Sequence, residues 1–98
     1  MATSEKLMGL ISKSYGIETL KALKHGEKSF MDIVKTIKAD KSTIYRRLLE
    51  FVEAGLVKER YDHKERRLKY SLTKEGKIVL KAVEYFEDVV RDIELATA

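Results

Sequence analysis

The spacing of apolar residues changes twice along this chain, and these changes limit the fold more than any other feature. Up to Leu56 the apolar residues recur every three or four positions, which indicates amphipathic helices. From Val57 to Leu72 they alternate with polar residues in two runs, which indicates the strands of a hairpin. After Thr73 the helical spacing returns. We therefore expect an α+β fold, mainly helical with one small β-hairpin.

Four helices are expected before the hairpin, and several residues mark where they begin and end. Gly26 is expected to end the second helix in a left-handed conformation. Asp40 is expected to cap the fourth helix by accepting hydrogen bonds from its first N–H groups. The sequence Ala54-Gly55-Leu56 is typical of a Schellman ending. The expected ranges are 4–13, about 15–25, 30–37 and about 41–54.

The two expected strands, 57–61 and 68–72, are joined by a polar loop of residues 62–67. This loop contains no glycine and is longer than a two-residue hairpin turn. Thr73 is expected to cap a last helix over residues 74–95, because its side chain can accept a hydrogen bond from the first turn.

Length and composition exclude several classes of protein. The 98 residues suffice for one domain, so 1–98 is expected to be a single unit. Without cysteine the chain has no disulfide, no cysteine-ligated zinc and no thiol catalysis. No apolar run approaches the roughly 18 residues of a membrane helix, and the first residues make a poor secretory signal, so a soluble, cytoplasmic protein is expected. No catalytic, phosphate-binding or metal-binding motif occurs, so we expect no enzyme, no cofactor and no metal.

Positive charge is concentrated in the middle of the chain. The net charge is +4, and residues 38–74 hold 11 Lys and Arg against 6 Asp and Glu. Residues 75–98 hold 3 against 6, so the last helix is acidic. A run of charge is often only a solvated face, but this balance also permits a polyanionic partner.

The helix expected at 41–54 carries polar and basic residues at its N-terminal and outer positions. A helix fits the DNA major groove, and its first turns are where side chains reach base edges. Each residue also has a simpler explanation: the hydroxyls start the helix, the tyrosine packs at the edge of the core, or the arginines are ordinary exposed residues. The candidate DNA contacts are Lys41, Ser42, Thr43, Tyr45, Arg46 and Arg47.

The hairpin loop offers a second group of cations. Flexible cations at a protruding tip can enter a minor groove or lie along phosphates. The alternative is a charged loop that only keeps the protein soluble, and Asp62 and Glu65 dilute its charge. The candidate residues are His63, Lys64, Arg66, Arg67 and Lys69.

Four stretches stand out, namely SFMDI (29–33), DKSTIYRRL (40–48), EAGLV (53–57) and YSLTKEG (70–76). Together they resemble winged helix-turn-helix transcriptional regulators, and the resemblance covers about residues 15–76. The similarity is greatest to the small MarR-, ArsR- and PadR-like groups, particularly their compact archaeal-type members. The resemblance implies that 41–54 is the recognition helix and that the 61–68 loop is the wing.

The chain also departs from the pattern of this family. The turn between the two short helices often carries glycine in the family, and here it is Lys38-Ala39. Metal-sensing members use clusters of cysteine or histidine, whereas this chain has no cysteine and two distant histidines. Metal sensing is therefore not expected, and redox sensing by cysteine is ruled out.

The last helix has two apolar rows, more than a core this small can cover, and an uncovered apolar face marks an interface. We expect a homodimer; the alternative is that the first helix covers the second row within the chain. The second row contains Ile78, Ala82, Tyr85 and Val89. The expected dimer interface combines the first row with the first helix, and comprises Leu7, Leu10, Ile11, Val79, Val83, Phe86, Val90 and Ile93.

Two functions from different classes remain open at this point. In the first, the chain is a sequence-specific, homodimeric regulator of transcription that binds double-stranded DNA, with no membrane partner and with no effector assigned. In the second, it is a winged-helix protein–protein interaction module in a larger assembly, and its basic residues are incidental.

Overall fold

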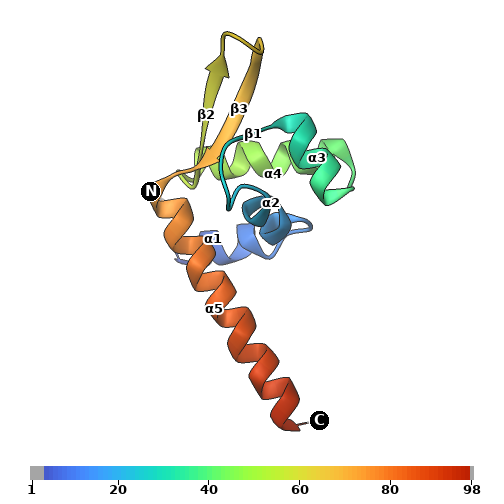
Figure 1. The fold of residues 1–98 in the computed structure, drawn as a ribbon. Helices are drawn as coiled ribbons and strands as arrows, with labels where there is room; N and C mark the ends of the chain where they lie inside the picture. The colour runs from blue at the N-terminus through green and yellow to red at the C-terminus, as the bar shows by residue number, and fades with distance from the viewer. Residues whose placement is uncertain (1–3, 98) are drawn as a thin grey trace.

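The computed structural model describes residues 4–97, in which a helical body carries a β-hairpin at one end and a long helix at the other (Figure 1). This arrangement confirms the expected α+β class. Among these residues no helix is both long and apolar enough to cross a bilayer. The elements are α1 (Ser4–Ile11), α2 (Gly16–Ala22), β1 (Lys28–Ser29), α3 (Phe30–Ile37), α4 (Lys41–Glu53), β2 (Val57–Asp62), β3 (Arg67–Leu72) and α5 (Lys74–Thr97).

Two predicted helix caps are confirmed. The Asp40 carboxylate accepts a hydrogen bond from the Thr43 N–H at 3.1 Å and so caps α4. The Thr73 hydroxyl oxygen accepts one from the Gly76 N–H at 3.0 Å and caps α5. Each bond satisfies one of the N–H groups that a helix N-terminus leaves without a partner.

The predicted Schellman ending of α4 is also confirmed. Gly55 has a φ of 81°, a conformation that costs glycine little because it has no Cβ. Its N–H donates to the Val52 carbonyl at 3.1 Å, and the N–H of Leu56 donates to the Phe51 carbonyl at 2.9 Å. Leu56 and Phe51 are both buried, so the motif also contributes two side chains to the hydrophobic core.

The second helix is shorter than its apolar spacing predicted. It ends at Ala22, and the N–H of Leu23 turns back to the Leu20 carbonyl at 3.1 Å, which tightens the last turn. Gly26 therefore does not end the helix. It lies in the loop before β1 with a φ of 141°, which side chains rarely tolerate. The first helix likewise ends at Ile11, two residues earlier than predicted.

The sheet has three antiparallel strands in the order β1-β3-β2, one more than predicted. β1 has two residues, too few for any alternation to reveal it, and pairs Lys28 with Tyr70. The pairing of Val57 with Leu72 places both on the same face of the sheet as Tyr70, and all three are buried. This register directs the base of the hairpin into the core and leaves its far end outside.

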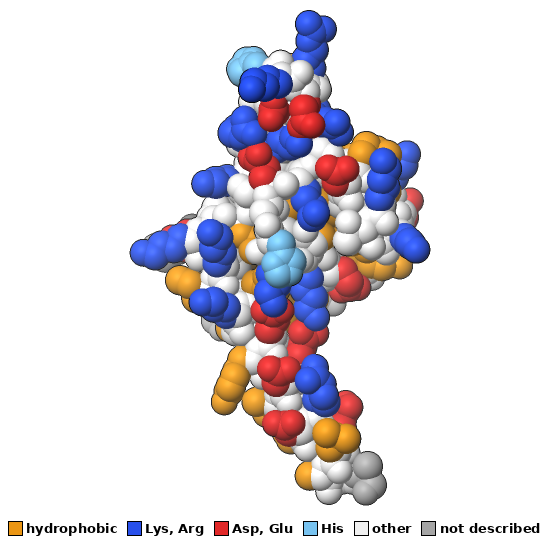
Figure 2. All heavy atoms as spheres, in the orientation of Figure 1, with side chains coloured by type: hydrophobic (Ala, Val, Ile, Leu, Met, Phe, Trp, Pro, Cys, Tyr) orange, Lys and Arg blue, Asp and Glu red, His pale blue; other side chains and the backbone are white. Residues whose placement is uncertain are grey.

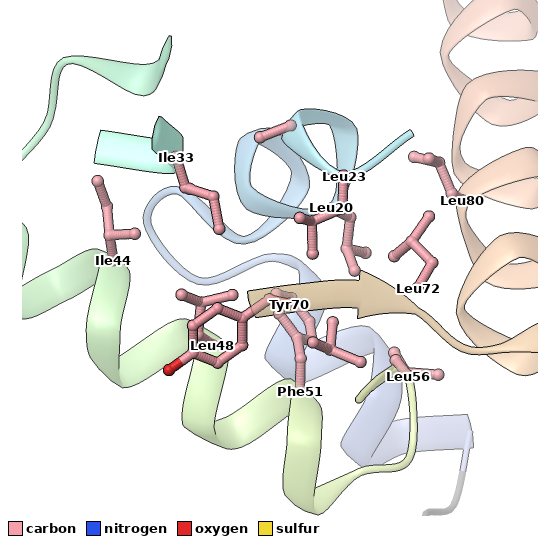
Figure 3. Close-up of a cluster of buried hydrophobic side chains, with 12 residues drawn as sticks. Leu20, Leu23, Ile33, Ile44, Leu48, Phe51, Leu56, Tyr70, Leu72 and Leu80 are labelled. Atoms are coloured by element: carbon pink, nitrogen blue, oxygen red, sulfur yellow. The ribbon is translucent and has the colours of Figure 1, made fainter. Parts of the chain in front are cut away.

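The core lies between α2, α3, α4 and the inner face of the sheet (Figure 3). One row of α4 side chains points toward α2 and toward the ring of Tyr70. These residues recur at intervals of three and four, so a single face of the helix is buried. The residues of the core with no exposed surface are Leu20, Ile33, Ile44, Leu48 and Phe51.

Helix α5 starts against this core and then leaves it. A Cβ on Gly76 would collide with the Leu56 carbonyl oxygen, so the first turn crosses the end of α4 as closely as glycine allows. Leu80 is buried one turn later. Two ion pairs then hold α5 to α2 and to the turn that follows it, Lys21–Glu87 at 2.8 Å and Lys24–Glu84 at 2.7 Å. From residue 91 to 97 every side chain is exposed, and this end of the helix extends away from the body (Figure 1).

Candidate nucleic-acid interface

The buried row of α4 determines which side chains of this helix face solvent. Because Ile44 and Leu48 point inward, Lys41, Tyr45 and Arg46 are left on the outside. Within residues 4–97 neither cation forms an ion pair, so both retain their hydrogen-bonding capacity. The start of α4 is thus a cationic edge.

The two hydroxyl residues in the first turn of α4 serve the helix cap. Ser42 Oγ donates to Asp40 Oδ2 at 2.5 Å, and Thr43 Oγ1 donates to the same oxygen at 2.9 Å. The Ser42 bond is the largest of the effects that hold the pKa of the Asp40 carboxyl below its usual range. Both hydroxyls can still accept hydrogen bonds, so helix initiation and contact with a ligand are compatible.

Arg47 is not on this outer face, so the outer position predicted for its side chain is wrong. The residue as a whole is 7% exposed. Nε donates to the Ser14 carbonyl at 2.9 Å, and Nη1 lies 2.6 Å from Glu50 Oε1. Glu50 in turn binds Lys13 at 2.7 Å, so this network ties α4 to the segment after α1.

The spacing of the buried row contains a signal that would have placed Arg47 correctly. Position 47 is three residues after Ile44 and four before Phe51, so it lies on the buried face. An exposed position was predicted because arginine carries a charge. The guanidinium is accommodated because it finds both a carbonyl and a carboxylate, which a buried cation requires.

Tyr45 connects α4 to the hairpin. Its ring meets Phe30 edge to face, with ring centroids 5.7 Å apart and an angle of 82° between the rings. Tyr45 also lines a groove of about 280 Å³, together with Met31 and with Arg67 and Leu68 of β3. Tyr45 is therefore both an edge of the core and a surface residue, and the outer face of α4 adjoins the base of the wing.

The loop at the tip of the hairpin is held by Asp62. Its Oδ1 accepts hydrogen bonds from the N–H groups of Lys64 at 2.9 Å and Glu65 at 3.1 Å. Arg66 occupies the left-handed conformation, with a φ of 53°, at the point where a shorter turn would carry glycine. The His63 ring packs edge to face on Tyr61, 4.9 Å between centroids. The tip is thus an ordered structure that presents its cations outward.

Three cations of the hairpin are paired within the chain. Arg60 binds both carboxylate oxygens of Glu27, at 3.0 and 2.7 Å, and this bond lowers the pKa of Glu27. Glu65 forms an ion pair with Lys69, and lies 3.8 Å from Arg67. In Figure 2 the acidic side chains of the hairpin accordingly lie just below the cations of its tip.

Lys64 and Arg66 therefore differ from the other predicted wing cations. Neither forms an ion pair with a residue of the 4–97 range. Lys69 is largely covered, while Arg67 is exposed and also donates to Ser29 Oγ at 3.3 Å. The structure thus brings all five predicted wing residues to the hairpin but leaves two of the cations unpaired.

The exposed apolar surface of α5 includes residues of both rows, not only the row predicted as the interface. Phe86 and Ile93 of that row are 67% and 57% exposed. Ile78 and Tyr85 of the second row are 60% and 72% exposed, so α1 does not cover them, and the sequence interpretation omitted them from the interface. Apolar side chains are visible along α5 in Figure 2. The residues of the predicted interface that pack partly against their own core are Leu7, Leu10, Ile11 and Val79.

A family model described as the HVO_A0261 N-terminal domain matches residues 5–94. This chain belongs to that family. A search among curated protein sequences found no match. No group of three or more metal-ligating side chains comes together in the part of the HVO_A0261-type domain that the structure describes.

Solved structures of transcriptional regulators share the fold of this HVO_A0261-type domain. A regulator of the MarR family from Enterococcus faecalis V583 superposes with a TM-score of 0.84, at 16% identity, covering 99% of this chain and 94% of that one. A PadR family regulator from Clostridium difficile R20291 gives 0.76, at 22% identity, covering 86% and 98%. Quinone-bound YodB from B. subtilis gives 0.76, at 25% identity, covering 90% and 93%. The winged helix-turn-helix fold inferred from the sequence is confirmed.

Proposed function

We propose that this chain is a homodimeric regulator of transcription that binds double-stranded DNA in a sequence-specific manner. Helix α4 would enter the major groove, and the wing at 62–67 would lie on the minor groove or on phosphates. The observation that carries the proposal is the groove between Tyr45 and Arg67, because it makes the outer face of α4 and the base of the wing neighbours on one surface. The fold shared with known regulators supports the same function.

The proposed DNA contacts follow from which side chains the fold leaves available. Arg47 is excluded because it is buried and paired within the chain. On the wing, Lys64 and Arg66 would contact phosphates first, since neither must leave an ion pair to do so. The contacts proposed on α4 are Lys41, Ser42, Thr43, Tyr45 and Arg46.

Helix α5 supports the homodimer. Its last turns, 91–97, have no support from the body, and an isolated helix that short is unstable in water. Its exposed rows would gain cover by packing against the same rows of a second copy, which makes a self-complementary two-fold contact. α5 leaves the body in the direction away from the hairpin, so pairing along it keeps the wing free (Figure 1). A two-fold dimer could then read half-sites about 34 Å apart.

Selection of bound duplexes from a random pool tests this proposal directly. We expect an enriched sequence with two-fold symmetry and half-sites one helical turn apart. A salt titration on that duplex should show a steep fall in affinity, because several phosphates are neutralised. Failure to bind any duplex at low salt would refute the proposal.

A second candidate function is a protein–protein interaction module, and the exposed apolar face of α5 is the observation that favours it. In that case α5 would pair with a different protein. Light scattering on the purified chain separates the two: a stable homodimer supports the regulator, whereas a monomer that binds no duplex supports the module.

A further inference from the structure

Glu65 occupies a defined place at the tip of the wing, between cations that could bind DNA. Its carboxylate forms an ion pair with Lys69 and lies 3.8 Å from Arg67. Its backbone N–H donates to Asp62 at 3.1 Å, which holds the residue in the turn. The Glu65 carboxylate therefore lies close to two cations, Arg67 and Lys69, at the edge of the proposed DNA-binding surface.

The effect of this pairing follows from the source of DNA affinity. A cation that neutralises a phosphate releases counterions from DNA, and this release supplies the sequence-independent part of binding. A cation that is already paired must first leave its carboxylate, and the freed carboxylate then repels the neighbouring phosphates. Arg67 and Lys69 should therefore contribute less to affinity than their charge suggests.

We propose that Glu65 is an internal competitor for DNA phosphate: in the free chain it holds Arg67 and Lys69, and DNA must displace it to use them. The residue thereby lowers the sequence-independent part of the affinity and raises the share of binding that depends on base contacts. This inference rests on the proposed DNA-binding function and names a specificity-determining residue within it.

The chain offers a matched control in Glu59. It lies on strand β2 of the same hairpin and is exposed, and it forms no ion pair within residues 4–97. Glu65→Gln and Glu59→Gln change the net charge equally. Any difference between them therefore reports the pairing and not the total charge.

The test measures binding of the full chain and both variants to a random-sequence duplex over a range of salt concentrations. We expect Glu65→Gln to raise the affinity about five- to tenfold at low salt and to steepen the logarithmic salt slope by about one to two, since each additional phosphate contact adds about 0.9. Glu59→Gln should raise the affinity less than about twofold and leave the slope unchanged.

A second measurement confines the effect to the two cations. In a background with Arg67→Gln and Lys69→Gln, the gain from Glu65→Gln should fall to less than about twofold, because the pairing is already gone and only the general effect of removing one negative charge remains. Equal gains for Glu65→Gln and Glu59→Gln, or a gain from Glu65→Gln that stays about five- to tenfold in this background, would overturn the competitor role alone. Absence of binding by every form of the chain would overturn both this role and the proposed function.

Discussion

The β-hairpin and helix α5 leave the body in opposite directions, and each carries side chains that the body does not cover (Figure 1). Several polar groups of the hairpin find partners within the chain. Asp62 accepts hydrogen bonds from the N–H groups of the loop, and Glu27 and Glu65 form ion pairs with three of the hairpin cations. Helix α5 does not, since Phe86 and Tyr85 remain largely exposed.

The hairpin and α5 differ because charged and apolar side chains need different kinds of partner. A charge needs only one well-placed group of opposite sign, and a neighbouring strand residue can supply it. Apolar surface is stabilised in proportion to the area removed from water, so it needs a whole opposing face. Within residues 4–97, carboxylates pair with three cations of the hairpin, but no element covers the exposed apolar rows of α5.

The largest expected effect concerns this uncovered face. Replacing both Phe86 and Ile93 with glutamate should convert the proposed homodimer into a monomer, because two carboxylates would be buried in an apolar interface without partners. Analytical ultracentrifugation measures the change. Arg91→Glu is the control, since Arg91 is exposed and, among the residues that the structure describes, forms an ion pair only with Asp88 of its own helix. Retention of the dimer by the double variant would show that the exposed rows are not the contact.

The attachment of α5 provides the next largest effect. Gly76→Ala should lower the free energy of unfolding by about 2 kcal/mol or more, because the new methyl group collides with the Leu56 carbonyl. This cost exceeds the gain of about 1 kcal/mol that alanine brings to a helix.

Gly9→Ala in α1 is the matched control, because a Cβ there meets nothing within 4 Å. It should raise the stability by roughly 0.5–1 kcal/mol through helix propensity alone. Urea unfolding distinguishes the pair. Two stabilising changes would mean that the start of α5 can shift away from α4 at little cost.

On the opposite side of the molecule, the unpaired wing cations should govern affinity and the recognition helix should govern sequence preference. Lys64→Ala with Arg66→Ala should weaken DNA binding about tenfold for all sequences and reduce the salt slope by about two. Arg46→Ala should instead cost about 1–3 kcal/mol of discrimination between the selected duplex and others.

Fluorescence anisotropy on selected and scrambled duplexes checks both expectations. The control removes two cations from α5, Lys77→Ala with Lys81→Ala, and should alter affinity little. An effect of the α5 pair as large as that of the wing pair would indicate that net charge alone controls binding.

The smallest expected effect concerns the cap of α4. The hydrogen bonds to Asp40 hold its pKa below the usual range, so its ionised form stabilises the fold. This contribution is complete above the unfolded pKa of about 4 and is lost as the pH falls through the lower folded pKa. Asp40→Asn keeps a capping oxygen but cannot titrate. The urea midpoints of the two proteins should therefore converge between about pH 5 and pH 2, and parallel curves would contradict the assignment.

The sequence predicted most of the fold because most of the signals are local. The cap at Asp40, the glycine at 55 and the alternation from Val57 to Leu72 each act within a few residues, and each is present in the structure. The shorter α2 escaped prediction because its end depends on how Leu23 packs into the core.

The candidate site was predictable in outline only. The sequence alone showed that cations occur on one helix and in one loop, because this depends only on which residues each segment contains. Spacing along α4 places Arg47 on the buried face, but its hydrogen bond there is to a carbonyl 33 residues away, and the exposure of Tyr85 depends on where α1 comes to lie. Such contacts are set by packing between distant segments, which no local pattern encodes.

By itself, then, the sequence determined the order of elements, their caps and the face that each buries, because hydrogen bonding and side-chain spacing operate over one or two turns. The packing of distant segments set the ion pairs Lys24–Glu84, Lys21–Glu87 and Arg60–Glu27 and left the apolar rows of α5 exposed, because these outcomes depend on distances between residues far apart in the sequence. The same charge can thus hold the body together at Arg47 and remain available at Arg66.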